Sequence, residues 1–116
     1  MPRPRKCRRV CCLPWNASFG PTGDQPAANT IVMSVDEYET IRLIDLLGLT
    51  QEECAAQMNV ARTTVQGIYN DARSKLADVL VNGKSLVIRG GDYAICESRE
   101  ETCACGGCCK HRREIE

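Results

Sequence analysis

Apolar side chains recur every three or four residues along three stretches of the chain, the spacing of helices that bury one face. Two stretches open with a capping box, in which a Ser or Thr hydroxyl accepts from the N3 amide and a Glu side chain reaches back. The two boxes are Ser34–Glu37 and Thr50–Glu53. Each stretch is followed by a residue that tolerates the left-handed conformation of a helix end, namely Gly48, Asn59 and Gly83. The pattern therefore predicts three helices within residues 34–83, the third beginning around Arg62.

The segments on either side of these helices have other patterns. Residues 1–33 hold all five prolines and few periodic apolar positions, so we predict a basic, irregular N-terminal arm. Residues 84–96 contain two short β-type runs around Gly90-Gly91, a pattern typical of a β-hairpin. Residues 97–116 are polar and rich in cysteine, with little apolar surface to bury. The predicted fold is mainly α: a three-helix bundle with a helix-turn-helix, followed by a short β-hairpin and a Cys-rich tail.

Length and charge narrow the function. A chain of 116 residues supports one small domain, whereas barrels and doubly wound enzymes need roughly 200 residues or more. The formal net charge is zero, but residues 34–53 carry six acidic side chains and one basic side chain. The first nine residues carry five cations and no anion, and residues 60–76 carry three cations against one anion. A basic arm and a basic third helix are the charge distribution expected of a phosphate-binding surface.

The second and third predicted helices are joined by a short turn, which is the pattern of a helix-turn-helix. Ala55 is small where the two helices must approach closely, and Val60 in the turn is placed to fill the space between them. Polar side chains suited to base edges and phosphates fall opposite the apolar face of the third helix. These candidate DNA contacts are Arg62, Thr63, Thr64, Gln66, Asn70 and Arg73. The cations of the arm are expected to contact the DNA backbone or minor groove: Arg3, Arg5, Lys6, Arg8 and Arg9.

Residues 49–65, which read LTQEECAAQMNVARTTV, resemble region 4 of bacterial RNA polymerase sigma factors. Further blocks are more particular: RPRKCRRV at 3–10, EYETIRLID at 37–45 and GGDY at 90–93. Together they resemble a family of small, functionally uncharacterised prokaryotic proteins with a sigma-region-4-like helix-turn-helix, which are predicted to bind DNA. The resemblance covers residues 2 to about 95 and implies base contacts from three residues: Arg62, Thr63 and Gln66. Ala61 departs from the motif, because the N-cap usually has Ser or Thr there, and losing that cap costs about 0.5–2 kcal/mol.

The nine cysteines suggest metal binding or redox chemistry before disulfides, if the compartment is a reducing cytosol. Thiolates two to four residues apart can converge on one ion, and the tail offers Cys103, Cys105, Cys108 and Cys109. The arm offers a weaker pair, Cys7 and Cys11. The spacing fits zinc and an iron–sulfur cluster equally, and the alternative is a tail of reduced thiols without metal. Cys54 is expected in the core, and Cys96 is compatible with either a core position or a metal ligand.

No catalytic arrangement emerges, because the single histidine, His111, lies in the tail and no nucleophile elbow, P-loop or dinucleotide loop is present. The basic start is not followed by the apolar region of a secretory signal, and no apolar run approaches a membrane span. We therefore expect a cytoplasmic protein that is not an enzyme.

The leading hypothesis is a transcriptional regulator that binds double-stranded DNA sequence-specifically, with a homodimer contacting two half-sites. One alternative is a metal- or redox-sensing adaptor that binds a protein, such as RNA polymerase, through the same helical face. The other is a plain three-helix module without affinity for nucleic acid.

Overall fold

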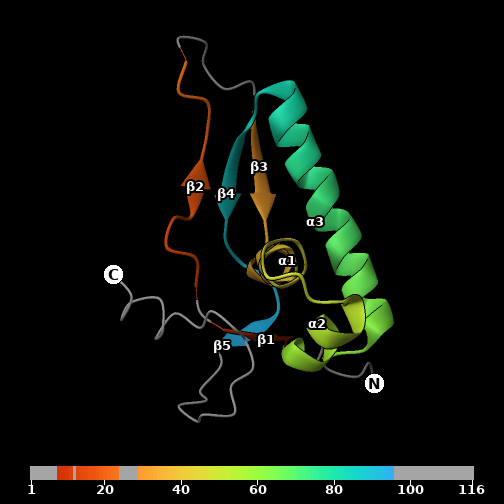
Figure 1. The fold of residues 1–116 in the computed structure, drawn as a ribbon. Coiled ribbons are helices and arrows are strands. Elements are labelled where there is room, and N and C mark those ends of the chain that lie inside the picture. The colour runs from red at the N-terminus through yellow and green to blue at the C-terminus, as the bar shows by residue number, and fades with distance from the viewer. Residues whose placement is uncertain (1–7, 12, 24–28, 96–116) are drawn as a thin grey trace, which may run out of the picture.

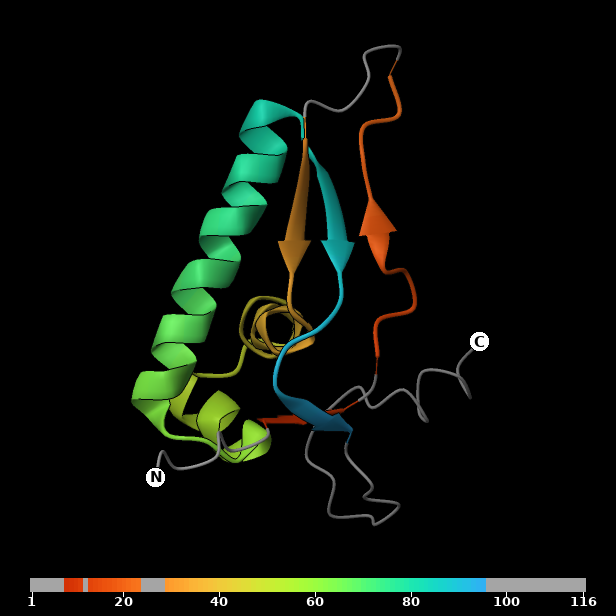
Figure 2. The same ribbon diagram turned by 180° about the vertical axis from the view of Figure 1, so that it is seen from behind.

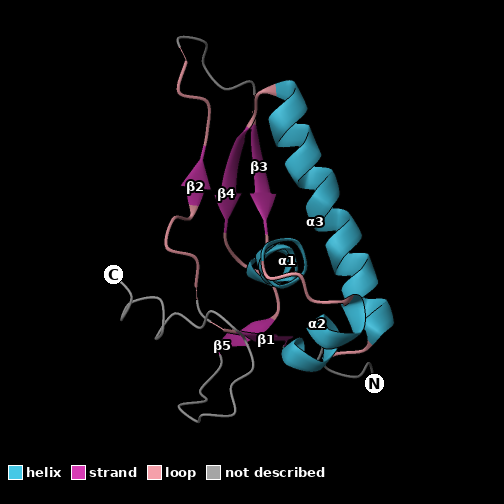
Figure 3. Cartoon of the chain, in the orientation of Figure 1, coloured by secondary structure: helices cyan, strands magenta, loops and turns pink. Residues whose placement is uncertain are grey.

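The computed structural model describes residues 8–11, 13–23 and 29–95. Along this part of the chain, three short strands are followed by the helices and then by two further short strands (Figure 3). The elements are β1 (Arg8–Val10), β2 (Ser18–Phe19), β3 (Thr30–Met33), α1 (Val35–Thr40), η1 (Ile41–Leu46), α2 (Gln51–Met58), α3 (Arg62–Asn82), β4 (Ser85–Ile88) and β5 (Tyr93–Ile95). The fold of the described residues is therefore mixed α/β, and the prediction of a mainly α three-helix bundle is wrong.

The strands form two small sheets rather than the predicted hairpin. β4 lies in the middle of a three-stranded sheet, antiparallel to β2 and parallel to β3. β5 instead pairs in parallel with β1, with Arg8 opposite Tyr93. Gly90 and Gly91 have positive φ values of 75° and 102°, and they lead the chain from one sheet to the other instead of folding β5 back on β4. The hairpin prediction over residues 84–96 is wrong for this reason.

The N-terminal segment also differs from the predicted irregular arm. It supplies three strands, and Val10 of β1 and Met33 of β3 are almost completely buried. β1 and β3 each bury one side chain, and both residues of β2 are exposed. Such runs are too short to show the alternation of apolar and polar residues that predicts a strand. The prolines were therefore the main signal in this segment, and they indicated irregular structure.

The predicted helices are confirmed, together with their ends. Ser34 and Thr50 both form complete capping boxes, with side-chain oxygens that accept from the amides of Glu37 and Glu53. The first helix continues from α1 into the π-helical segment η1, in which the amide of Leu47 donates to the carbonyl of Arg42. Gly83 ends the 21-residue helix α3 in the left-handed conformation.

The helix α3 connects two apolar clusters. In Figures 1 and 2, its C-terminal half runs beside β3, while its N-terminal half packs on α2. One cluster is formed by strands of both sheets together with α1 and α3, and it contains Val10, Met33, Val35, Ala72, Leu86 and Ile88. The other lies between η1, α2 and α3 and contains Leu43, Cys54, Ala55, Met58 and Val65. Among the described residues, no helix combines the length and apolar character that a bilayer-spanning segment requires.

Candidate nucleic-acid interface

The connection between α2 and α3 is a tight turn. Asn59 adopts the left-handed conformation with φ 60°, and the amide of Val60 donates to the carbonyl of Ala55 at 3.0 Å. This bond and that of Asn59 to Ala56 satisfy the last carbonyls of α2, as in a Schellman motif. Ala55 is buried between the helices and Val60 packs against the same cluster, as predicted from the sequence, and Val65 of α3 is buried beside them. The turn and its core therefore fix the direction in which α3 leaves α2.

One face of α3 presents a row of polar side chains to solvent. Arg62, Gln66, Asn70 and Arg73 are three or four residues apart and all exposed, so they share one side of the helix. Thr63 is exposed beside this row, whereas Thr64 is half-buried on the flank of the helix. The structure thus brings together five of the six candidate contacts that the sequence placed on this helix.

Beneath the row lies Tyr69, which is buried on α3. The Tyr69 hydroxyl donates to Oδ1 of Asp45 at 2.7 Å, and this hydrogen bond raises the pKa of Tyr69 above its usual value. The guanidinium carbon of Arg73 lies 5.4 Å from the centre of the same ring, within the range of a cation–π contact. Arg73 is therefore held over Tyr69 on the surface of α3.

The two described cations of the arm are engaged within the fold. The Arg9 side chain donates to the carbonyls of Gln57 and Ala56 at 2.8 and 3.4 Å, at the C-terminal end of α2. Arg8 forms ion pairs with Asp36 at 3.0 Å and with Asp92 at 3.6 Å. Its side chain is only 16% exposed. The other predicted arm contacts, Arg3, Arg5 and Lys6, lie outside the described residues.

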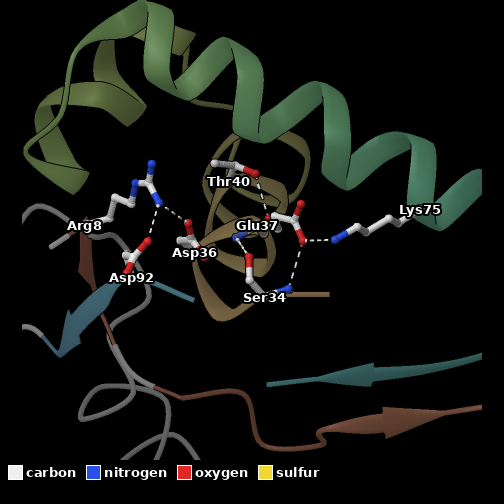
Figure 4. A network of polar contacts seen from close by, with 7 residues as sticks. All are labelled: Arg8, Ser34, Asp36, Glu37, Thr40, Lys75 and Asp92. Atoms are coloured by element: carbon white, nitrogen blue, oxygen red, sulfur yellow. Dashed lines mark hydrogen bonds and ion pairs between the residues drawn. The ribbon is translucent and has the colours of Figure 1, made fainter. Parts of the chain in front are cut away.

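A second network joins α1 to α3 (Figure 4). The Glu37 carboxylate accepts from the Ser34 amide at 2.9 Å and from Nζ of Lys75 at 2.7 Å. Lys75, one of the three cations counted within residues 60–76, is therefore paired within the fold. Between this network and the Arg8 ion pairs lies a pocket of about 440 Å³. Its lining includes Thr63 and Thr64 of α3.

The described cysteines are core residues. Cys54 is fully buried, with its thiol 3.7 Å from the sulfur of Met58. Burial, reinforced by the nearby charge of Glu39, raises the pKa of Cys54 to about 12. Cys11 is also buried, and its amide donates to the buried carboxylate of Glu39 at 3.0 Å.

The predicted metal sites cannot be placed on this framework. The candidate ligands Cys7, Cys103, Cys105, Cys108 and Cys109 lie outside the described residues, as do Cys96 and His111. Within the described ranges, no group of three or more His, Cys, Asp or Glu side chains is arranged to hold a metal ion.

Several buried polar contacts were not identified from the sequence. The pair Glu39–Arg42 has a spacing of three residues, a signal that could have been recognised within one helix. The pairing of Arg8 with Asp36 and Asp92 gave no local signal, because the partners come from three separate segments.

Comparisons with known proteins give a consistent result. The family model described as "Protein of unknown function DUF134" matches residues 1–96. A UPF0251 protein of Desulfitobacterium hafniense (strain Y51) is 60% identical over 119 residues, which cover 99% of this chain and 92% of the relative. A UPF0251 protein of Ruminiclostridium cellulolyticum is 46% identical, covering 89% of this chain and 79% of the relative. No solved structure matches the chain.

Proposed function

The chain belongs to the family described as protein of unknown function DUF134, and from the geometry of α2 and α3 we propose that it binds double-stranded DNA sequence-specifically as a transcriptional regulator. In this proposal, α2 and α3 act as a helix-turn-helix of the sigma-region-4 type. The helix α3 enters the major groove, and α2 crosses the DNA backbone.

The observation that carries the proposal is the exposed row on α3. Its side chains have the chemistry of base readout: Arg forks onto guanine, and Gln and Asn pair with adenine. The row consists of Arg62, Gln66, Asn70 and Arg73, all on the side of α3 that faces solvent. A solvated helix face without function needs no such selection of bidentate donors, and glutamate is absent from all of α3.

The start of α3 supports the same orientation. Ala61 gives no side-chain cap, so the first amides of the helix keep donors that can bind a phosphate. Arg62 and Thr63 are exposed directly beside these amides. The first turn of α3 therefore combines phosphate-binding and base-reading groups at the end that would enter the groove.

Selection from a pool of random duplexes with the full-length protein tests the proposal. We expect an enriched sequence and a binding constant that falls steeply as salt rises, because phosphate contacts release counterions. If no duplex binds above background at about 50 mM salt, where such contacts are strong, the proposal is wrong.

Matched substitutions separate base readout from net charge. R62A and R89A each remove one exposed arginine, but Arg89 follows β4 and is not on α3. R62A should reduce discrimination between the selected site and a site with one changed base by about 5- to 150-fold, the equivalent of 1–3 kcal/mol. R89A should leave this discrimination unchanged. Equal effects of the two variants would contradict a base contact by Arg62.

A second pair tests the amide contacts. N70A on α3 should relax the preference at one base position, whereas N29A removes an equally exposed amide before β3 and should not. An unchanged preference in N70A would place the reading face elsewhere on α3.

A further inference from the structure

The exposed side of α3 changes from polar to apolar along its length. The polar row begins at Arg62 and ends at Arg73, and the last turns of the helix then present Ala77, Leu80 and Val81 to solvent. Intervals of three and four residues place these three on the same side of the helix as Arg73. Leu80 and Val81 are 81% and 80% exposed, the largest fractions among the large apolar side chains of the described residues. We call Ala77, Leu80 and Val81 the apolar end of α3.

The apolar end faces away from the core of the protein. On the other side of the same turns, Leu76 and Val79 already pack against the buried cluster around Ala72. In Figures 1 and 2, the C-terminal half of α3 forms one edge of the molecule, with β3 on its inner side. Contiguous apolar side chains that face solvent mark contact surfaces for other proteins. The apolar end is therefore a small docking surface at the edge of the fold.

The charges next to the apolar end are neutralised within the fold. Beyond Arg73, α3 has two charged side chains, Lys75 and Asp78. Nζ of Lys75 lies 2.7 Å from the Glu37 carboxylate, and the Asp78 carboxylate lies 2.9 Å from Nζ of Lys84. In a two-fold contact each surface meets its own copy, so an unpaired charge near the axis faces the same charge. Because these charges are paired, the apolar end meets a second copy of itself without that repulsion.

The length of α3 also fits a pair of copies on one duplex. Leu80 lies about 27 Å along the helix axis from Arg62, at 1.5 Å per residue. Two copies of α3 that meet at their apolar ends hold their first turns up to about 54 Å apart, and a V-shaped meeting brings them closer. Half-sites on one face of a duplex are about 34 Å apart. The first turns of such a pair can therefore reach two neighbouring half-sites.

We propose that the apolar end of α3 binds the same surface of a second copy when both copies occupy neighbouring half-sites, an inference that rests on the proposed DNA binding. The contact is weak by itself, because two exposed aliphatic side chains supply much less than the ~800 Å² per partner that stable complexes bury. Binding to one duplex raises the effective concentration of the two copies. The polar row then reads bases, while the apolar end of the same helix couples the two copies.

Sedimentation equilibrium of the reduced full-length protein, without DNA, tests the contact itself. L80Q/V81T replaces two exposed aliphatic side chains by uncharged polar ones, so the fold and the net charge are kept. L13Q is the control, because Leu13 is also exposed but precedes β2. At about 1 mM protein, which detects millimolar dissociation constants, we expect dimerisation of the wild type and L13Q. Association of L80Q/V81T should be at least fivefold weaker. A monomeric wild type, or equal association of all three proteins, would overturn the proposal.

Duplexes with one half-site or with two inverted half-sites about 10 base pairs apart test the coupling on DNA. We expect a second wild-type copy to bind at least tenfold more tightly than a copy on a single half-site. L80Q/V81T should lose this gain and keep the wild-type affinity for a single half-site, whereas L13Q should keep both. Independent binding of two wild-type copies, or full coupling in L80Q/V81T, would contradict the proposed contact.

The two experiments separate this inference from the proposed function. Dimerisation without binding to any duplex would refute the DNA-binding proposal and leave the contact between copies intact. Sequence-specific binding by a wild type that neither dimerises nor couples on DNA would refute only the contact.

Discussion

The hydroxyl of Tyr69 donates a hydrogen bond to Oδ1 of Asp45 at 2.7 Å. This contact ties α3 to η1, and the same ring holds Arg73 at 5.4 Å on the exposed side. Tyr69 is itself buried, so a core residue holds one member of the exposed row on α3. Tyr69 connects the core of the α2–α3 unit to its outer surface.

Y69F should lower the free energy of unfolding by about 1 kcal/mol at neutral pH, since the hydrogen bond to Asp45 is lost. The bond to Asp45 raises the pKa of Tyr69, so its contribution is complete below the unfolded-state pKa of about 10 and is lost as pH rises through the folded-state pKa. Urea unfolding at pH 7 to 11 measures this, and the difference between wild type and Y69F should shrink above pH 10. Y38F is the control, because Tyr38 has no hydroxyl hydrogen bond among the described contacts. A constant difference across this range would exclude the assigned cause.

A61S should stabilise α3. Ala61 already has the extended backbone of an N-cap, with φ −72° and ψ 152°, so a Ser hydroxyl there can accept from a free amide of the first turn. The gain should be about 0.5–2 kcal/mol. A77S, in the exposed interior of the same helix, should instead lose a few tenths of a kcal/mol. Thermal unfolding distinguishes them, and equal shifts in both variants would show that Ala61 is not a cap position.

R42M should be strongly destabilising. Arg42 forms two bonds of 2.9 Å to the carboxylate of Glu39, which is fully buried. Removal of one partner leaves an uncompensated charge and should cost about 3–5 kcal/mol. The double variant E39Q/R42M removes the charge but keeps an acceptor for the Cys11 amide, so it should be more stable than R42M alone. A double variant as unstable as R42M would show that packing of Arg42, and not the isolated charge, is responsible.

Cys54 should be chemically inert in the folded protein. Burial raises its pKa from 9.0 to about 12, so at pH 8 almost no thiolate is present for alkylation. Iodoacetamide at pH 8 should leave Cys54 unmodified in native protein and modify it in urea, as measured by mass spectrometry of the peptide that contains it. Because only the unfolded thiol ionises between pH 9 and 12, Cys54 should leave the free energy of unfolding unchanged below pH 9 and lower it as pH rises toward 12. Native modification at the rate seen in urea would contradict this environment.

The sequence alone determined the helices and their ends. Capping boxes at Ser34 and Thr50, the left-handed residue Asn59 and the exposed row on α3 depend on contacts within a few residues, and such contacts leave a local pattern. The predicted DNA contacts on α3 followed from this helical periodicity, which is why the structure brings most of them onto one face.

Only the tertiary structure decided the strands and the pocket. Arg8 pairs with Tyr93 across almost the whole described chain, and strands of three or four residues are too short to reveal such a partner by their period. Arg8 reads as a phosphate contact in the sequence, yet in the fold it lies between Asp36 and Asp92. The sequence gives the number of charged side chains, but only the folded structure decides which of them form ion pairs. In the described part of the fold, two arginines lie in the exposed row on α3, and four carboxylates line the pocket beside it.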